Sequence, residues 1–211
     1  MCGIAGIIHR GKSSNVGSEM TSMLVALKHR GPDSSGFAVY GEPKSGEFLM
    51  RIKVAEQEDM DKGRGATTLI RDRICQIDEI LTEHNVEVKE KENITAYALR
   101  YVISHNGDVQ AMAQHIEEVE GVEILSLGSC LGLVKDLGDA TIVSEQYGLS
   151  NFRGTHAIGH TRMATESDVD IRSAHPYWAF PYNDIAVVHN GQITNYWMMR
   201  REMERKGHRF M

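Results

Sequence analysis

Apolar residues follow a strand-like pattern at the start of the 211-residue chain and a helical pattern soon after. The first eight residues form a short apolar run with two glycines, which predicts a buried strand ending near His9. Apolar side chains then recur at helical spacing from Ser18, the expected N-cap, to Leu27. A second strand is expected at 37–40, after a polar, turn-rich stretch. The chain therefore begins in the order strand, helix, strand.

The middle of the chain has the pattern of a separate α/β unit. Residues 66–85 and 108–119 predict helices, while residues 86–91, 94–103 and 122–127 predict strands. The order helix, strand, strand, helix, strand is typical of a small two-layer subdomain, and a ferredoxin-like arrangement is one option for it. We therefore expect an inserted α/β subdomain whose function the sequence does not reveal.

The last expected element is a basic, methionine-rich helix over 195–206, which Gly207 ends. Before it, His156 and His160 stand four residues apart, a spacing that suits a metal pair on a helix. The residues between them are typical of a strand, and no glutamate follows the first histidine. We therefore expect no metal site there.

Composition and charge narrow the class of protein. Hydrophobic residues make up 41% and charged residues 25% of the chain, which is ordinary for a globular protein. No apolar run approaches the length of a membrane span, and the N-terminus lacks the pattern of a secretory signal. A net charge of −6 argues against general nucleic-acid binding. We expect a cytoplasmic protein that acts on a small molecule.

The three cysteines, Cys2, Cys75 and Cys130, are too few and too scattered for a disulfide framework, and none forms a Cys-x-x-Cys pair. Cys75 and Cys130 are expected to be buried as small apolar residues. The glycines over 121–138 lack both a P-loop and a G-x-G-x-x-G pattern. We therefore expect no cofactor in this chain.

Cys2 is the candidate nucleophile. Removal of Met1 would leave the Cys2 thiol and a free α-amine on one residue. An amine that titrates near neutral pH can take up the thiol proton and later return it to a leaving amine, which suits amide cleavage. The alternative is a small apolar residue that merely begins a buried strand.

A second candidate stretch lies at 29–36. A helix stop and a turn account for its glycine and proline. They account less well for the clustered His29, Arg30 and Asp33, which favour a hydrogen-bonded brace around a site.

Four blocks of sequence extend this picture. They are Cys2-Gly3-Ile4-Ala5-Gly6, His29-Arg30-Gly31-Pro32-Asp33-Ser34, Gly159-His160-Thr161-Arg162-Met163-Ala164-Thr165 and Val188-His189-Asn190-Gly191-Gln192-Ile193. In residues, order and spacing they resemble the class II glutamine amidotransferases, the N-terminal-nucleophile hydrolase domains that release ammonia from glutamine. The resemblance implies an α+β fold, a four-layer αββα sandwich, and hydrolysis of glutamine to glutamate through a Cys2 thioester.

The resemblance also implies which residues bind the substrate. Arg162 is the candidate for the α-carboxylate of glutamine, which a guanidinium binds bidentately. Thr165 and His189 are candidates for the same pocket. Glu166 is a further candidate, as is His175, although a turn before a proline-led strand explains both equally well.

Asn190 and Gly191 are the implied oxyanion hole, with the Asn190 side-chain amide and the Gly191 backbone N–H as donors. An Asn-Gly hairpin turn is the structural alternative. A similar tripeptide, His105-Asn106-Gly107, also follows an apolar stretch. Its position relative to the other blocks predicts a plain turn.

The resemblance sets the expected domain organisation. Residues 1–55 and 150–211 form the amidotransferase domain, and 56–149 form the inserted α/β subdomain. Nothing after Gly207 matches the aspartate that holds the substrate α-amine in the family, so the sandwich is expected to be incomplete at its C-terminal side. That contact then comes from a continuation of the chain, from a second polypeptide or from elsewhere.

The segment 166–178 resembles the glutamate-synthase-type branch. This implies a synthase domain or subunit that accepts ammonia, within a homo- or hetero-oligomer. Two rival functions stay open. Another N-terminal-nucleophile amidase would not depend on Arg162, and a non-catalytic regulatory or scaffolding subunit would keep the fold without turnover.

Overall fold

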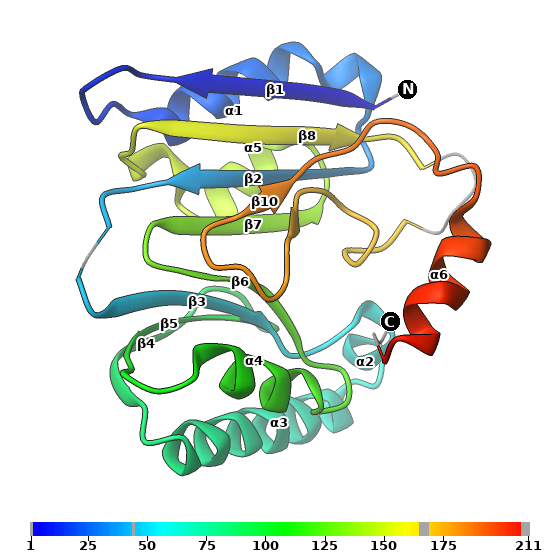
Figure 1. Cartoon of the computed structure of the whole chain (residues 1–211). Coiled ribbons are helices and arrows are strands. Elements are labelled where there is room, and N and C mark those ends of the chain that lie inside the picture. Colours follow the sequence, from blue (N-terminus) through cyan, green and yellow to red (C-terminus); the bar gives the residue numbers. More distant parts are fainter. Residues whose placement is uncertain (1, 44, 165–168, 208–211) are drawn as a thin grey trace.

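The computed structural model describes residues 2–43, 45–164 and 169–207. Figure 1 shows two antiparallel sheets, one above the other in this view, each with helices on one face. A short hairpin crosses the free face of the first sheet, and the last helix lies at its side.

The first sheet has the strand order β1-β8-β2-β7, and all its pairs are antiparallel. Its strands are β1 (Gly3–Ile8), β8 (His156–Arg162), β2 (Ser34–Tyr40) and β7 (Leu131–Leu137). Gly3 pairs with Thr161, and Ser34 pairs with Arg162. This register brings the start of β1, the start of β2 and the end of β8 together at the same end of the sheet.

Helices α1 (Val16–Ala26) and α5 (Ala140–Gln146) cover one face of this sheet (Figure 1). Their apolar side chains pack on alternate residues of the strands, and the core includes Met20, Leu24, Phe37, Val39, Val134 and Val143. The first helix begins earlier than the sequence predicts. Asn15, not Ser18, stands at its N-cap, because backbone bonds between Ser14 and Gly154 already turn the chain there.

The second sheet has the order β4-β5-β3-β6 and is antiparallel throughout. Along the chain its elements are β3 (Glu47–Lys53), the short α2 (Gln57–Met60), α3 (Arg64–Glu83), β4 (Glu87–Asn93), β5 (Ala98–Ser104), α4 (Val109–Glu117) and β6 (Glu123–Gly128). This is the β-α-β-β-α-β order of a ferredoxin-like unit. Both long helices pack on one face of the sheet, over a core that includes Ile52, Ile77, Tyr101, Met112 and Leu127.

Two strands, β7 and β3, belong to a different sheet from the one that the predicted domain boundaries imply. β7 lies in the first sheet although its residues belong to the range 56–149, and β3 lies in the second sheet although it precedes residue 56. The periodicity does not predict either strand, because Lys53, Lys135 and Asp136 are buried charges within them. The division into an amidotransferase domain and an insertion stays a prediction.

One expectation about the cysteines is wrong. Cys75 is exposed, because the buried face of α3 carries Ile77, Ile80 and Leu81 instead. Cys130 is partly buried, and burial raises the pKa of its thiol to about 11.

The remaining elements follow the first sheet. The hairpin consists of β9 (Tyr177–Trp178) and β10 (Ala186–Val187), and α6 (Tyr196–Arg205) comes after it. The described residues also include two 3-10 turns, η1 (Lys28–Arg30) after α1 and η2 (Leu149–Asn151) after α5. Within the described ranges, no helix has both the length and the apolar character needed to cross a bilayer.

The chain is therefore a mixed α/β protein built on antiparallel sheets, which is compatible with the predicted sandwich. The four-layer arrangement and its incompleteness at the C-terminal side stay predictions.

Candidate active site

Cys2 lies immediately before β1, at the end of the first sheet. Residues of the other three sequence blocks contact it there. Its thiol lies 3.8 Å from the Met163 carbonyl oxygen, to which it can donate. Its own carbonyl oxygen accepts hydrogen bonds from Arg30 Nε at 3.1 Å and from Asn190 Nδ2 at 3.0 Å. The fold thus gathers residues 2, 30, 163 and 190 around one backbone position.

Arg30 and Asp33 form the brace that the sequence favours. The Asp33 carboxylate accepts from the Ala164 backbone N–H at 2.7 Å, and the Asp33 N–H donates to the Arg162 carbonyl at 3.1 Å. A Cβ at Gly31 would lie 2.5 Å from the backbone of Arg162, so only glycine permits this approach. His29 is exposed. The turn after η1 therefore holds the end of β8 against the start of β1.

Arg162 is the last residue of β8, and only 6% of its surface is exposed. His160 lies two residues earlier, on the same face of the strand. Burial lowers the pKa of His160 to about 4 and that of His175 to about 3. Their ring centroids are 4.6 Å apart. Both imidazoles are therefore neutral near pH 7, so neither adds positive charge to that of Arg162.

The predicted oxyanion residues lie on the open side of Cys2. Asn190 and Gly191 are both exposed. An amide NH2 carries two hydrogens, so the bond from Asn190 to the Cys2 carbonyl leaves one for a substrate oxygen. A Cβ at Gly191 would lie 3.0 Å from the His189 ring. The His189 side chain thus lies beside the Gly191 backbone.

Two substrate candidates, Thr165 and Glu166, lie outside the described residues. The similar tripeptide His105-Asn106-Gly107 belongs to the other unit, in the turn between β5 and α4. No group of three histidine, cysteine, aspartate or glutamate side chains suited to a metal ion occurs in the described part of the chain.

Sequence reasoning missed Asp184, which anchors the hairpin that leads to Asn190. Its carboxylate accepts from the backbone N–H groups of Ser129 at 3.0 Å, Cys130 at 2.8 Å and Leu131 at 2.8 Å, and from Ser129 Oγ at 2.8 Å. Burial alone would raise the pKa of Asp184, but these donors hold it below its usual value. The only signal in the sequence is a turn-forming Asn-Asp pair.

Replacement of Asp184 by alanine is expected to lower the free energy of unfolding by about 1–3 kcal/mol, because three backbone N–H groups lose their acceptor. Because the pKa of Asp184 is lowered in the folded protein, its contribution is present above about pH 4 and is lost as the pH falls further. Urea unfolding at pH 7 measures the loss. Ser129→Ala removes one of the four bonds and is the milder control; equal effects of the two variants would contradict the anchor.

Comparison with known proteins gives the same family as the four blocks. No model of a protein family matches the chain. A Methanothermobacter thermautotrophicus protein named "Putative glutamine amidotransferase" is 38% identical over 213 residues, which cover 100% of this chain and 67% of that protein. The glutamine amidotransferase-like protein GlxB of Rhizobium meliloti is 30% identical over 98% of this chain and 64% of its own length.

A third relative matches over a shorter stretch. Glutamine–fructose-6-phosphate aminotransferase of Aeropyrum pernix is 38% identical over 91 residues, which cover 43% of this chain and 15% of that enzyme. The chain spans about two thirds of the length of the first two relatives. With full-length similarity at this level, and with the family's blocks gathered around Cys2, the chain belongs to the class II glutamine amidotransferases of the N-terminal-nucleophile type.

Proposed function

We propose that this chain carries out the glutaminase half-reaction of an amidotransferase: it hydrolyses glutamine to glutamate and ammonia through a thioester on Cys2. The observation that carries the proposal is the convergence on Cys2. Met163 directly follows β8, Arg30 ends η1, and Asn190 lies in the segment after β10. These segments are far apart in sequence and meet at the one residue that can carry both a thiol and a terminal amine.

The proposed reaction begins after removal of Met1. The α-amine of Cys2 takes the thiol proton, and Sγ attacks the side-chain amide carbon of glutamine. The resulting oxyanion is held by the Asn190 side chain and the Gly191 N–H. The ammonium group then returns the proton to the leaving nitrogen, ammonia departs, and a thioester remains. Water attacks the thioester and releases glutamate.

The two hydrogen bonds to the Cys2 carbonyl fit this role. Arg30 and Asn190 together restrict rotation of the backbone at residue 2. Because the α-amine and Sγ belong to the same residue, fixing the Cys2 backbone also limits the orientations that these two groups can adopt. A positioned nucleophile and base reduce the entropy that must be lost in the reaction.

In this proposal Arg162 binds the α-carboxylate of glutamine, and Thr165, Glu166 and His189 shape the pocket. Ammonia passes to a synthase domain or subunit of the glutamate-synthase type. That part rests on the resemblance of residues 166–178.

Labelling with a diazo-ketone glutamine analogue, followed by intact-mass analysis, tests the proposal. We expect loss of the Met1 mass and one adduct, mapped to Cys2. Arg162→Ala is expected to slow labelling by about ten- to a hundred-fold, because a charge-assisted bond to the carboxylate is lost. Labelling by iodoacetamide, which has no α-carboxylate to position, should change little.

Arg153→Ala is the matched control, because Arg153 is exposed and donates to the Ser13 carbonyl. Each rival function predicts a different result. Labelling that does not depend on Arg162 would favour another N-terminal-nucleophile amidase. Processed protein without an adduct would favour a non-catalytic subunit.

A further inference from the structure

A cavity of about 430 Å³ lies away from Cys2, between the second sheet and the hairpin. The end of α4 and the start of β6 form one side, and residues of β7 and β9 form the other. Its apolar wall is made of Ile124, Leu125, Tyr177, Trp178 and Phe180. This volume is within the range of small-molecule sites. None of the described residues that hydrogen-bond to Cys2, which are Arg30, Met163 and Asn190, lines it, so we treat it as a separate site.

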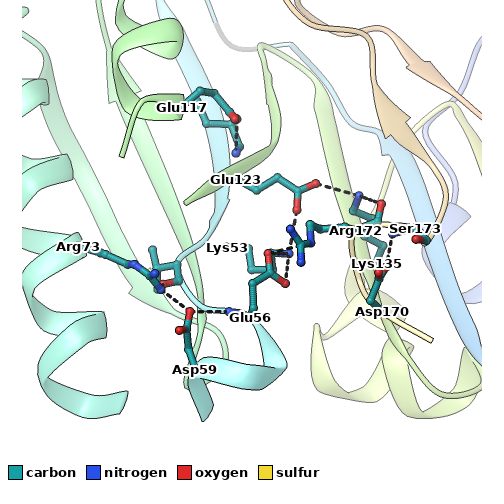
Figure 2. Close-up of polar contacts among 12 residues, drawn as sticks. Lys53, Glu56, Asp59, Arg73, Glu117, Glu123, Lys135, Asp170, Arg172 and Ser173 are labelled. Carbon is teal, nitrogen blue, oxygen red and sulfur yellow. Dashed lines mark hydrogen bonds and ion pairs between the residues drawn. The ribbon is translucent and has the colours of Figure 1, made fainter. Parts of the chain in front are cut away.

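One charged group in the cavity wall, Glu123, is already neutralised. Its carboxylate pairs with Lys53 at 2.9 Å and with Lys135 at 3.0 Å. Both lysines are buried, with side chains 1% and 2% exposed. Figure 2 shows Glu123 between these two amines. The positive charge of Lys135 is therefore not available to attract an anionic ligand.

Glu117, at the end of α4, has no such partner. Its carboxylate accepts one hydrogen bond, from the Ile124 backbone N–H at 2.5 Å, and it lies apart from the lysines in Figure 2. Among the described residues, none of the lysine, arginine or histidine side chains forms an ion pair with it. Burial raises the pKa of Glu117 to about 7 and the Glu123 charge adds to this effect, while the Ile124 N–H and the charges of Lys135 and Lys53 oppose it. A carboxyl group thus faces the cavity, and no basic side chain of the described residues forms an ion pair with it.

The aromatic side chains suit the same kind of ligand. Trp178 and Phe180 meet edge to face with ring centroids 5.4 Å apart, and the Trp178 N–H is already bound to the Tyr182 carbonyl. Trp178 and Phe180 can therefore contact a ligand mainly through the faces of their rings. Aromatic rings attract cations, and an anion would be repelled by the ionised carboxylate of Glu117. A neutral apolar ligand would leave Glu117 unpaired.

We propose that this cavity binds an organic cation, a primary ammonium group on an aromatic or apolar body. The ammonium pairs with Glu117, and the body packs against Trp178 and Phe180. This site is distinct from the proposed glutaminase centre and does not depend on it.

Three soluble probes of similar shape test the inference: benzylammonium, benzyl alcohol and benzoate. Each probe is titrated into the ¹⁵N-labelled full chain, and NMR spectra record the backbone amide signals and the indole N–H signal of Trp178. Benzylammonium is expected to shift the signals of Ile124 and Trp178 and to bind about ten-fold more tightly than benzyl alcohol, with benzoate weakest. Equal affinity for all three would mean an apolar slot only, and absence of shifts at these residues would overturn the site.

Glu117→Gln keeps an acceptor for the Ile124 N–H but removes the charge. It is expected to weaken benzylammonium binding about ten-fold and to leave benzyl alcohol unchanged. Glu120→Gln, at an exposed position beyond α4, is the matched control and should bind like the parent protein. Unchanged benzylammonium affinity in Glu117→Gln would overturn the assignment of Glu117.

The pH dependence is a second, independent readout. The groups around Glu117 are Glu118 on its own helix, Glu123 on β6, Lys135 on β7 and Lys53 on β3. The carboxyl must be ionised to hold the cation, so affinity is expected to fall as the pH falls. With a pKa of about 7, the ionised fraction, and hence the affinity, drops about ten-fold between pH 8 and pH 6. Glu117→Gln should abolish this dependence; a dependence that persists would contradict the proposal.

Discussion

Cys2→Ala is expected to abolish glutamine hydrolysis, with a loss of about 10⁴–10⁶-fold in turnover. Cys2 is the only cysteine that stands at the meeting point of the four blocks, and removal of its sulfur leaves no nucleophile for the thioester. Release of glutamate from glutamine, measured with a coupled dehydrogenase, gives the rate.

Cys75→Ala is the matched control, because Cys75 is exposed on α3 in the other unit. It should retain the parent rate. Cys2→Ala should still bind glutamine, which calorimetry measures, since Arg162, the proposed partner of the substrate carboxylate, is intact. Full turnover by Cys2→Ala would contradict the nucleophile assignment. Inactivity of both cysteine variants would point to lost folding rather than lost chemistry, which circular dichroism distinguishes.

The parts of the fold with clean patterns could be predicted from the sequence. The first strand, α3, α4 and α6 all lie within a few residues of their predicted ranges. Each has apolar side chains at one period and a recognisable end. Asp108, for example, caps α4 by accepting from two backbone N–H groups, as its position before the apolar run suggests.

The parts that could not be predicted are those in which charge is buried. Lys135 in β7 looks like a solvent-facing residue, yet its side chain is 2% exposed because Glu123 neutralises it and the Tyr177 ring lies 4.9 Å from its amine. Asp136, beside it, accepts from the hydroxyl groups of Tyr97 and Tyr147. The spacing of apolar residues carries no information on partners that lie far away in sequence, so it does not predict the strand β7.

The candidate site likewise has one part that the sequence predicts and one that it does not. The four blocks could be recognised because their residues are contiguous, and the fold brings members of each of them to Cys2. The anchor through Asp184 could not, because its partners Ser129 to Leu131 lie more than fifty positions away and act through their backbone. Backbone N–H groups are present at every non-proline residue, so they leave no trace in the sequence.

The buried charges also show how the two units are joined. Glu123 and Lys53 belong to the second sheet, while Lys135 belongs to the first. Tyr97, before β5, donates to Asp136 in β7 at 2.6 Å. Removal of one partner from such a pair leaves a buried charge unpaired, which is strongly destabilising. The second unit is therefore fastened to the first by specific contacts, and the cavity with Glu117 is held at their junction.

Asn190→Ala is expected to lower kcat for glutamine hydrolysis by about 10²–10³-fold, because loss of one oxyanion donor costs about 2.7–4 kcal/mol of transition-state stabilisation. KM should change little, since the oxyanion exists only after attack. Asn106→Ala is the matched control, because the same tripeptide there forms a plain turn in the other unit.

Asn190 also holds the Cys2 carbonyl, so two roles have to be separated. Arg30→Ala removes the other bond to that carbonyl but no oxyanion donor. If Asn190 stabilises the oxyanion, Asn190→Ala should lose far more kcat than Arg30→Ala, while iodoacetamide labels Cys2 at similar rates in both variants. If the two variants lose kcat equally, Asn190 acts by positioning Cys2, and the oxyanion donors must be sought in the Gly191 backbone and elsewhere.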